Sequence, residues 1–248
     1  MLLSVPLTII VFLVGVLIGG VGIGGVLLVP ALKYLGDISL HVAIPACMLS
    51  YIVTGSVGAY IYAGHGSINW QLAARVCIGA LPGAYFGAYL LPHINTLVLE
   101  AGIALLLITS GLFTLIDNGS SNGKKQVGGL TLLFIGFVTG VGSALSGTGG
   151  PLLLIPILVW LKVAVLTAIG LSQAIQIPIS LMATIGNVMY AEVDFRLGLT
   201  LAAIIVGGTV IGAKTVHLMP VGVLKKLVAG LLILVGVLMI AKLLGKIL

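Results

Sequence analysis

Charged residues are scarce in this chain. Of its 248 residues only 6% are Asp, Glu, Lys or Arg, whereas 60% are hydrophobic. A soluble globular protein carries about 25% charged residues, so this inventory could not cover a water-facing surface. Uncharged runs such as residues 6–32 exceed the roughly 20 residues that a helix needs to cross a bilayer core. The composition therefore predicts an all-α polytopic membrane protein in contact with the lipid bilayer.

Acidic residues are the rarest charged type, with five Asp and Glu in total. Within the predicted spans only Glu100 appears, near the start of the fourth apolar segment. This argues against a cation pathway or a carboxylate proton relay. There is also no HExxH motif, no paired carboxylates, no Ser-His-Asp spacing and no nucleotide-binding loop. We therefore expect no enzymatic activity.

Cysteine is nearly absent, and the net charge is modest. Cys47 and Cys77 both fall in apolar segments, at a spacing that favours neither a disulfide nor a metal site. The net charge of +6 lies mostly at predicted membrane boundaries, where it suits lipid head groups and topology control. No nucleic-acid partner is expected. The first residues carry no Lys or Arg, so a cleavable signal peptide is not expected either.

Glycine is abundant, and it marks an internal repeat. "GIGGVLLVP" (22–30) is echoed by "GTGGPLLLIP" (147–156), an offset of about 125 residues. "PGAYFGA" (82–88) falls opposite "GGTVIGA" (207–213) at the same offset. We predict a first membrane repeat at 1–116, a polar linker at 117–127 and a second repeat at 128–248. Each repeat has four apolar segments, about eight in all: 5–32, 40–63, 71–91 and 95–116, then 128–161, 164–189, 197–216 and 223–245.

The first segment of each repeat is too long for one straight span. Residues 128–161 would run about 50 Å as a helix, against a bilayer core of about 30 Å. The segment is therefore broken, strongly tilted or re-entrant, and its glycines mark the break. If both first segments cross the membrane, the repeats are parallel. If both return to their own side, the repeats are inverted, which gives the more uneven Lys and Arg distribution and is favoured on that ground.

Broken helices at matching places in two repeats are typical of secondary transporters. Each break frees backbone groups that only protein or water can satisfy, and the N-terminus of the following helix attracts anions. The second half-helices would begin near Gly24–Gly25 and near Gly149–Gly150, and Pro151 suits a first turn. The alternative is close helix packing through small residues, which we favour for the pairs Gly83/Gly87 and Gly208/Gly212.

At this point the chain resembles the TauE/SafE family of sulfite exporters, also called the 4-toluene sulfonate uptake permease family. The resemblance lies in the paired glycine signatures, in "AIGLSQ" (168–173), in the loops "GSINW" and "AEVDF", and in "LPGAYFGAYL". It implies transport of a small sulfur-containing or organic anion, such as sulfite, a sulfonate or sulfoacetate, without a cofactor. It also implies a prokaryotic plasma (inner) membrane location.

We expect the anion to bind between the two repeats, at glycine backbone and small polar donors. Isolated Ser and Thr more often bond to their own helix, and Gln often ties helices together. Arg75 could attract the anion, although such a residue more often snorkels to the interface. The candidate binding residues are Gly22, Gly24, Gly25, Cys47, Ser50, Thr54, Ser146, Thr148, Gly149, Gly150, Ser172, Gln173 and Gln176.

The functional hypothesis is a secondary transporter, driven by the substrate gradient or by a coupling proton or sodium ion. An anion channel with the same site and a non-transport membrane subunit are the alternatives. Saturable flux and counterflow would separate a transporter from a channel. The sequence leaves the oligomeric state open, a homodimer included.

Overall fold

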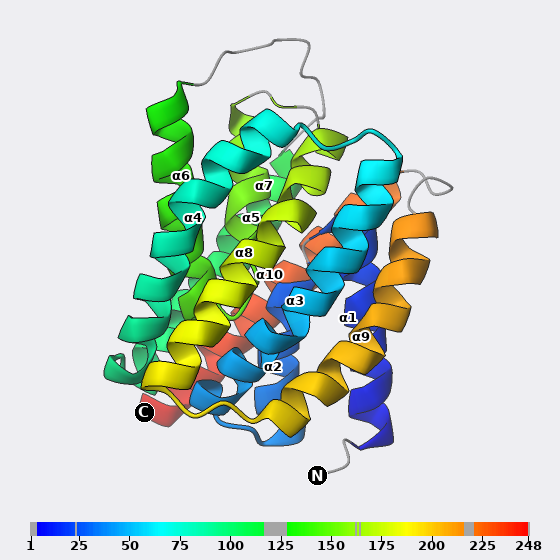
Figure 1. Cartoon of the computed structure of the whole chain (residues 1–248). Helices are drawn as coiled ribbons and strands as arrows, with labels where there is room; N and C mark the ends of the chain where they lie inside the picture. Colours follow the sequence, from blue (N-terminus) through cyan, green and yellow to red (C-terminus); the bar gives the residue numbers. More distant parts are fainter. Residues whose placement is uncertain are drawn as a thin grey trace.

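The computed structural model describes residues 4–22, 24–116, 128–161, 163, 165–215 and 221–247. The predicted linker at 117–127 lies outside these residues. Within the described part all regular structure is helical (Figure 1). The elements are α1 Val5–Val21, α2 Gly25–Gly36, α3 Leu40–Gly64, α4 Trp70–Leu90, the 3-10 turn η1 Leu91–His93, α5 Thr96–Ile116, α6 Gly129–Ser146, α7 Pro151–Trp160, α8 Val165–Tyr190, α9 Phe195–Thr215 and α10 Val221–Ile247.

The polytopic all-α class agrees with these helices. Among the described residues, six helices are long and apolar enough to cross a membrane: α3, α4, α5, α6, α8 and α9. Helices α1 and α2 and the described apolar part of α10 are shorter. The count of about eight spans therefore stays a prediction. The predicted segment ends agree with the helix ends to within a few residues, because uncharged runs and polar connections alternate clearly along the chain.

Both glycine signatures break a helix, as the segment lengths predict. Helix α1 ends at Val21 and α2 begins at Gly25, while α6 ends at Ser146 and α7 begins at Pro151. Gly22 (φ 79°) and Gly147 (φ 69°) close the first helix of each pair in the left-handed conformation, which glycine adopts at helix C-termini without the Cβ penalty. Residues 128–161 are therefore two helices, and the single straight helix is excluded.

The two short helices fold back on the helices that precede them. A Cβ on Gly24 would lie 2.6 Å from the Val14 carbonyl oxygen, and one on Gly36 would lie 3.1 Å from the Leu7 side chain. The end of α2 thus returns to the beginning of α1, and we call α1–α2 the first hairpin. Likewise α7 packs on α6, with Leu153 against Gly142, and forms the second hairpin.

The two hairpins enter the bundle from opposite ends. In Figure 1 α1 begins at the lower end, where both chain termini are marked, and α2 leads back to the start of α3 at that end. Helix α6 begins at the upper end, and α8 runs from the upper end to the lower one. We call the lower end the terminal end of the bundle. Each hairpin therefore begins and finishes at its own end.

Glycine stripes hold each hairpin against a long helix. Helix α1 packs along α9, and α6 packs along α4. A Cβ on Gly83 would come within 3.0 Å of the Phe137 carbonyl, and one on Gly212 would come as close to the Val16 carbonyl. Only glycine allows these backbones to approach so closely. The packing interpretation of Gly83/Gly87 and Gly208/Gly212 is thus confirmed.

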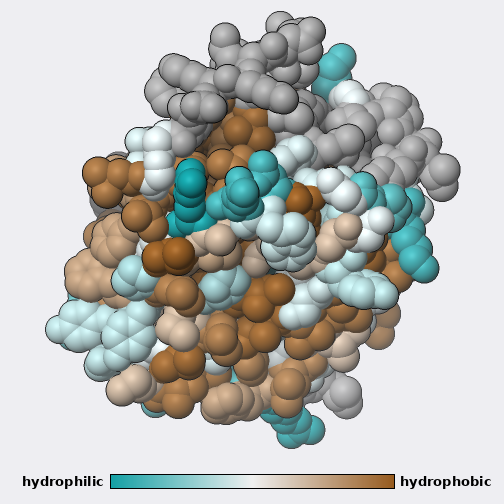
Figure 2. Space-filling model, turned by 45° about the horizontal axis from the view of Figure 1, so that its top comes forward, coloured by the Kyte–Doolittle hydropathy of each residue, from teal (hydrophilic) through white to brown (hydrophobic). Residues whose placement is uncertain are grey.

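The surface is apolar around the flank and polar near the ends. In Figure 2 hydrophobic residues cover much of the visible flank, and hydrophilic ones gather below the grey atoms of the upper end. Large side chains such as Leu130 and Phe134 are exposed, whereas one continuous cluster of buried apolar residues joins the helices inside. This distribution suits a molecule whose flank contacts lipid.

Candidate functional site at the hairpin tips

The turns of the two hairpins meet inside the bundle. A Cβ on Gly25, the first residue of α2, would lie 3.0 Å from the Thr148 carbonyl oxygen in the α6–α7 turn. The described residues of both turns are buried. The first turns of α2 and α7 begin here, and the N–H groups of a first helical turn have no partner within their own helix. The meeting point, which we call the tip site, thus combines two positive helix ends.

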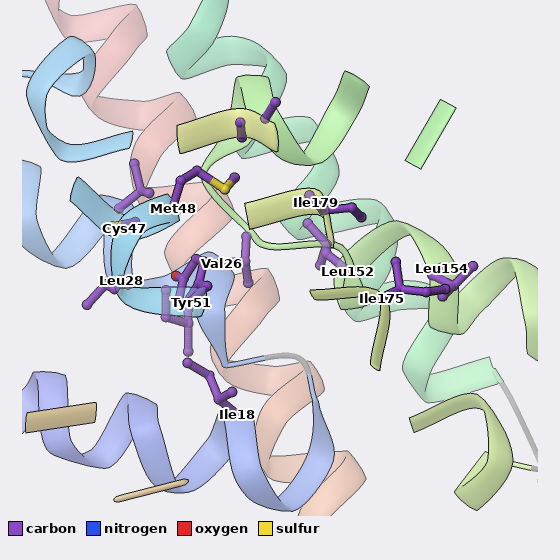
Figure 3. Packing of buried hydrophobic residues seen from close by; sticks show 14 of the residues in the cluster. Ile18, Val26, Leu28, Cys47, Met48, Tyr51, Leu152, Leu154, Ile175 and Ile179 are labelled. Atoms are coloured by element: carbon purple, nitrogen blue, oxygen red, sulfur yellow. The ribbon is translucent and has the colours of Figure 1, made fainter. Parts of the chain in front are cut away.

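Tyr51 of α3 reaches across the first hairpin tip. Its hydroxyl donates a 2.7 Å hydrogen bond to the Gly25 carbonyl, and its ring would contact a Cβ on Gly149 at 2.9 Å. Figure 3 shows Tyr51 beside Val26 of α2. Leu152 of α7 and Ile179 of α8 lie to the right of them in this view. One side chain therefore touches both tips.

Gln173 and Gln176 of α8 border the two hairpin tips, next to α3. The Gln173 amide donates a 2.6 Å hydrogen bond to the Ile18 carbonyl near the end of α1. The Gln176 amide nitrogen would lie 3.0 Å from a Cβ on Gly149. Both side chains are buried, and neither Oε1 has a hydrogen-bond partner among the described residues.

Two glycines of α3 make room for these glutamines. A Cβ on Gly55 would lie 3.1 Å from the Gln176 side chain, and one on Gly58 would lie 2.5 Å from the Gln173 amide oxygen. Helices α3 and α8 pack along each other through these contacts. The glutamines therefore stand between the hairpin tips and a glycine-lined face of α3.

The predicted hydroxyl donors divide into two groups. Ser146 and Thr148 lie in the second tip, with their oxygens 3.0 Å apart, and Ser172 lies 3.1 Å from the Cβ position of Gly22. Ser50 and Thr54 lie on α3 and donate to carbonyls of their own helix, those of Cys47 and Tyr51 among them. Ser146 and Ser172 make bonds of the same kind, to the carbonyls of Gly142 and Ile169. The hydroxyls of Ser50 and Thr54 thus make bonds within their own helix, which is the alternative to anion binding. Cys47 is buried in the same stretch of α3.

Arg75 does not join the tip site. Its side chain is exposed near the start of α4, beside Gly129 at the start of α6. The tip residues that the structure brings together are Gly22, Gly24, Gly25, Ser146, Thr148, Gly149, Gly150, Ser172, Gln173 and Gln176.

Two tyrosines outside the list of predicted binding residues border the site, although Tyr51 lies in the same candidate stretch of α3 as Cys47, Ser50 and Thr54. Tyr51 touches both tips, and Tyr62 donates to the carbonyls of Gly19 and Gly20 at the end of α1. The repeat offset of about 125 residues holds a clue, since it pairs Tyr51 with Gln176 and Tyr62 with Asn187. Because the matched residues differ in type, the repeat alone did not single out the tyrosines.

The described residues around the tip site carry no fixed negative charge. An ion pair joins Lys33 of α2 to Glu100 of α5, away from the tips. No group of three or more His, Cys, Asp or Glu that could hold a metal ion occurs in the described part of the chain. The arrangement offers amide, hydroxyl and backbone donors in an uncharged setting, which suits a small anion.

Comparisons with known proteins relate the chain to membrane transporters. The family model of the sulfite exporter TauE/SafE family matches residues 7–239. The chain is 30% identical to the probable membrane transporter protein YdhB of Bacillus subtilis, over 91% of this chain and 98% of that protein. It is 29% identical to a probable membrane transporter protein of Methanocaldococcus jannaschii, over 70% and 68% of the two chains.

A shorter match of 81 residues, at 40% identity, relates 31% of this chain to 13% of the probable membrane transporter protein MamO of Magnetospirillum gryphiswaldense. No solved structure matches the chain. The family match spans nearly the whole chain, from α1 into α10. The chain belongs to the sulfite exporter TauE/SafE family of membrane transporters.

Proposed function

We propose that this protein is a secondary transporter of a small sulfur-containing or organic anion, which binds at the tip site between two inverted repeats. The observation that carries the proposal is the contact between the two hairpin tips at Gly25 and Thr148. Helices that end at mid-membrane and aim their N-termini at one point are the arrangement that secondary transporters use for anionic substrates.

The chemistry of the surrounding side chains supports an oxyanion. Sulfite and sulfonates present several acceptor oxygens on one centre, and first-turn N–H groups donate to such oxygens. The amides of Gln173 and Gln176 and the hydroxyl of Thr148 add neutral donors within the same buried region. The Ser146 hydroxyl donates to the Gly142 carbonyl. A carboxylate at this place would repel the substrate, and the described acidic residues lie elsewhere.

Alternating access is supported by the way each hairpin is held. The first hairpin packs on α9 and the second on α4, so each is attached to a helix of the other half. Rocking of each hairpin together with its long helix would open the tip site to one end of the bundle at a time. Close contacts across the tips, such as Gly149 with Tyr51, favour a carrier over a continuously open pore. A proton or sodium gradient remains the proposed energy source.

A ligand screen tests the substrate class. Purified protein is heated with sulfite, sulfate, methanesulfonate, toluenesulfonate or chloride at matched ionic strength, and the melting temperature is recorded. A true ligand stabilises the folded state by about 2.7 kcal/mol at a hundred times its Kd. We expect one or more sulfur oxyanions to raise the melting temperature in a saturable way.

The test variant is Gln176→Leu, which removes the amide and leaves an apolar side chain. This variant should fold and should lose the ligand-dependent shift, because the amide borders Gly149. If no sulfur oxyanion stabilises the native protein, or if Gln176→Leu responds as the native protein does, the proposed site is wrong.

A further inference from the structure

Five buried polar side chains without partners among the described residues lie on α6 and α8, two helices that contact each other, and we call them the polar line. Ser180 and Asn187 of α8 and Thr139 and Ser143 of α6 are fully buried, and Thr184 of α8 is only 8% exposed. Their side-chain oxygens, and the Asn187 amide nitrogen, have no hydrogen-bond partner among the described residues. About 90% or more of buried polar groups in proteins are paired, so this cluster needs an explanation.

The usual local bond does not satisfy these hydroxyls. Elsewhere in the chain Ser50, Ser172 and Thr200 donate to carbonyls three or four residues earlier in their own helices. That is the common arrangement for Ser and Thr in membrane helices. The hydroxyls of the α6 and α8 line make no such bond. They are therefore available to water or to a passing solute.

The line leads from the tip site to the terminal end of the bundle. Gln176, Ser180, Thr184 and Asn187 follow at intervals of four, four and three residues, so they share one face of α8. From Gln176 to Asn187 this face runs about 16 Å at 1.5 Å per residue. Asn187 lies in the last turn of α8, at the terminal end.

Helix α4 supplies no polar partner to this line. It packs against both α6 and α8, and α6 also contacts α8. Its buried residues are small and apolar: Ala73, Val76, Gly79, Ala80, Gly83, Ala84, Gly87 and Ala88. Past Asn187, the Tyr190 hydroxyl of α8 lies 2.9 Å from the Tyr85 hydroxyl of α4. The line thus ends at two phenols that are partly exposed at the surface.

The corresponding positions in the other half are apolar or already bonded. At the offset of 125 residues, Thr139 and Ser143 correspond to Val14 and Ile18, and Thr184 corresponds to Ala59. Asn187 corresponds to Tyr62, whose hydroxyl donates to the Gly19 and Gly20 carbonyls. All of these counterparts are buried. The polar line is therefore a feature of one half, which repeat packing does not require.

We propose that this line is the hydrated pathway by which the anion passes between the tip site and the terminal end of the bundle. The proposal rests on the proposed function and adds the route to it. Hydroxyl and amide donors replace part of the anion's hydration shell along α8. The corresponding face of α3 carries Ala59 in place of a polar residue, and its Tyr62 is hydrogen-bonded to the end of α1. This face closes the route from the tip site to the upper end of the bundle in this conformation.

Thiol labelling tests the pathway independently of transport. In a background with Cys47→Ala and Cys77→Ala, Ser180→Cys and Thr184→Cys are compared with Ala59→Cys, the counterpart of Thr184→Cys. The reagent is an anionic, membrane-impermeant methanethiosulfonate, and modification is followed by intact mass. Ser4→Cys, at the exposed start of α1, and Gln71→Cys, at the exposed start of α4, mark the two ends in oriented vesicles.

We expect Ser180→Cys and Thr184→Cys to react about tenfold or more faster than Ala59→Cys, since the thiolate is the reactive form and apolar burial suppresses it. They should react only in vesicles that expose Ser4→Cys, and methanesulfonate should slow the reaction. Rates equal to that of Ala59→Cys, labelling from the Gln71→Cys side, or faster reaction with a cationic reagent would each overturn the pathway. Anion binding without labelling leaves the tip site standing and removes only this route.

Discussion

The hydroxyl of Tyr51 donates a 2.7 Å hydrogen bond to the carbonyl of Gly25, so α3 holds the first residue of α2 in place at the tip of the first hairpin. This carbonyl, in the first turn of α2, lies beside the N–H groups of the same turn, which face the tip site in the proposed function. Holding that carbonyl therefore sets where those N–H groups point. The same ring contacts the second tip at Gly149.

Removal of that hydroxyl should weaken the tip without unfolding the protein. Tyr51→Phe loses one buried hydrogen bond, which costs about 1 kcal/mol, or a fall of roughly 2–4 °C in melting temperature for a chain of this size. We also expect lower anion flux in proteoliposomes. Tyr60→Phe is the control, because Tyr60 is 82% exposed. Equal behaviour of the two variants would show that the Tyr51 bond has no role.

Gly149 should not tolerate a side chain. Its φ of +74° is left-handed, and a Cβ would lie 2.9 Å from Tyr51. The backbone conformation alone makes Gly149→Ala less stable by roughly 1–2 kcal/mol, and we expect ligand-dependent stabilisation to disappear. Gly102→Ala in α5 is the matched control, since nothing lies within 4 Å of its Cβ position. The account fails here if Gly149→Ala keeps both its melting temperature and its ligand response.

The ion pair between Lys33 and Glu100 should fasten the first hairpin to α5. Their side chains are 14% and 4% exposed, and removal of one partner of a buried pair costs about 3 kcal/mol or more. We expect Lys33→Met and Glu100→Gln each to lower the melting temperature clearly. The double variant should recover part of the loss, since it removes both charges of the pair together. Additive losses in a double-mutant cycle would contradict a direct pair.

Thr184→Val should separate transport from stability. The substitution replaces an unpartnered buried hydroxyl with a methyl group of the same shape, a change that is nearly neutral or stabilising in a packed core. We expect an unchanged or higher melting temperature together with slower anion flux. Thr209→Val in α9 is the control, because Thr209 bonds to the Gly15 carbonyl outside the proposed pathway. Unchanged flux in Thr184→Val would argue against the pathway.

Much of the fold could be predicted because hydrophobic runs and glycine breaks are local signals. The ends of α3, α5 and α8 lie close to the predicted segment ends, and the break before Pro151 follows from the length of segment 128–161. The sequence also indicated that Gly83 and Gly212 serve helix packing, because small residues at four-residue spacing carry that meaning in membranes.

The predicted site was less complete, because it depends on contacts between distant segments. Ser50 and Thr54 carry suitable donors, but their hydroxyls bond to their own helix. The contact of Tyr51 with both tips depends on how α3 packs against the hairpins, and Arg75 is exposed near the start of α4, away from the tips. The sequence also left open whether the first segment of each repeat crosses the membrane or returns to its own side. A glycine break in the helix is compatible with both.

Flux through reconstituted protein tests the central claim most directly. Proteoliposomes with the native chain, Gln176→Leu or Gly102→Ala are assayed for uptake of labelled sulfite or a labelled sulfonate, with and without unlabelled anion inside. The account predicts saturable uptake and counterflow by the native chain and by Gly102→Ala, and loss of both in Gln176→Leu. Absence of flux for every sulfur oxyanion, or undiminished flux in Gln176→Leu, would contradict transport at the hairpin tips.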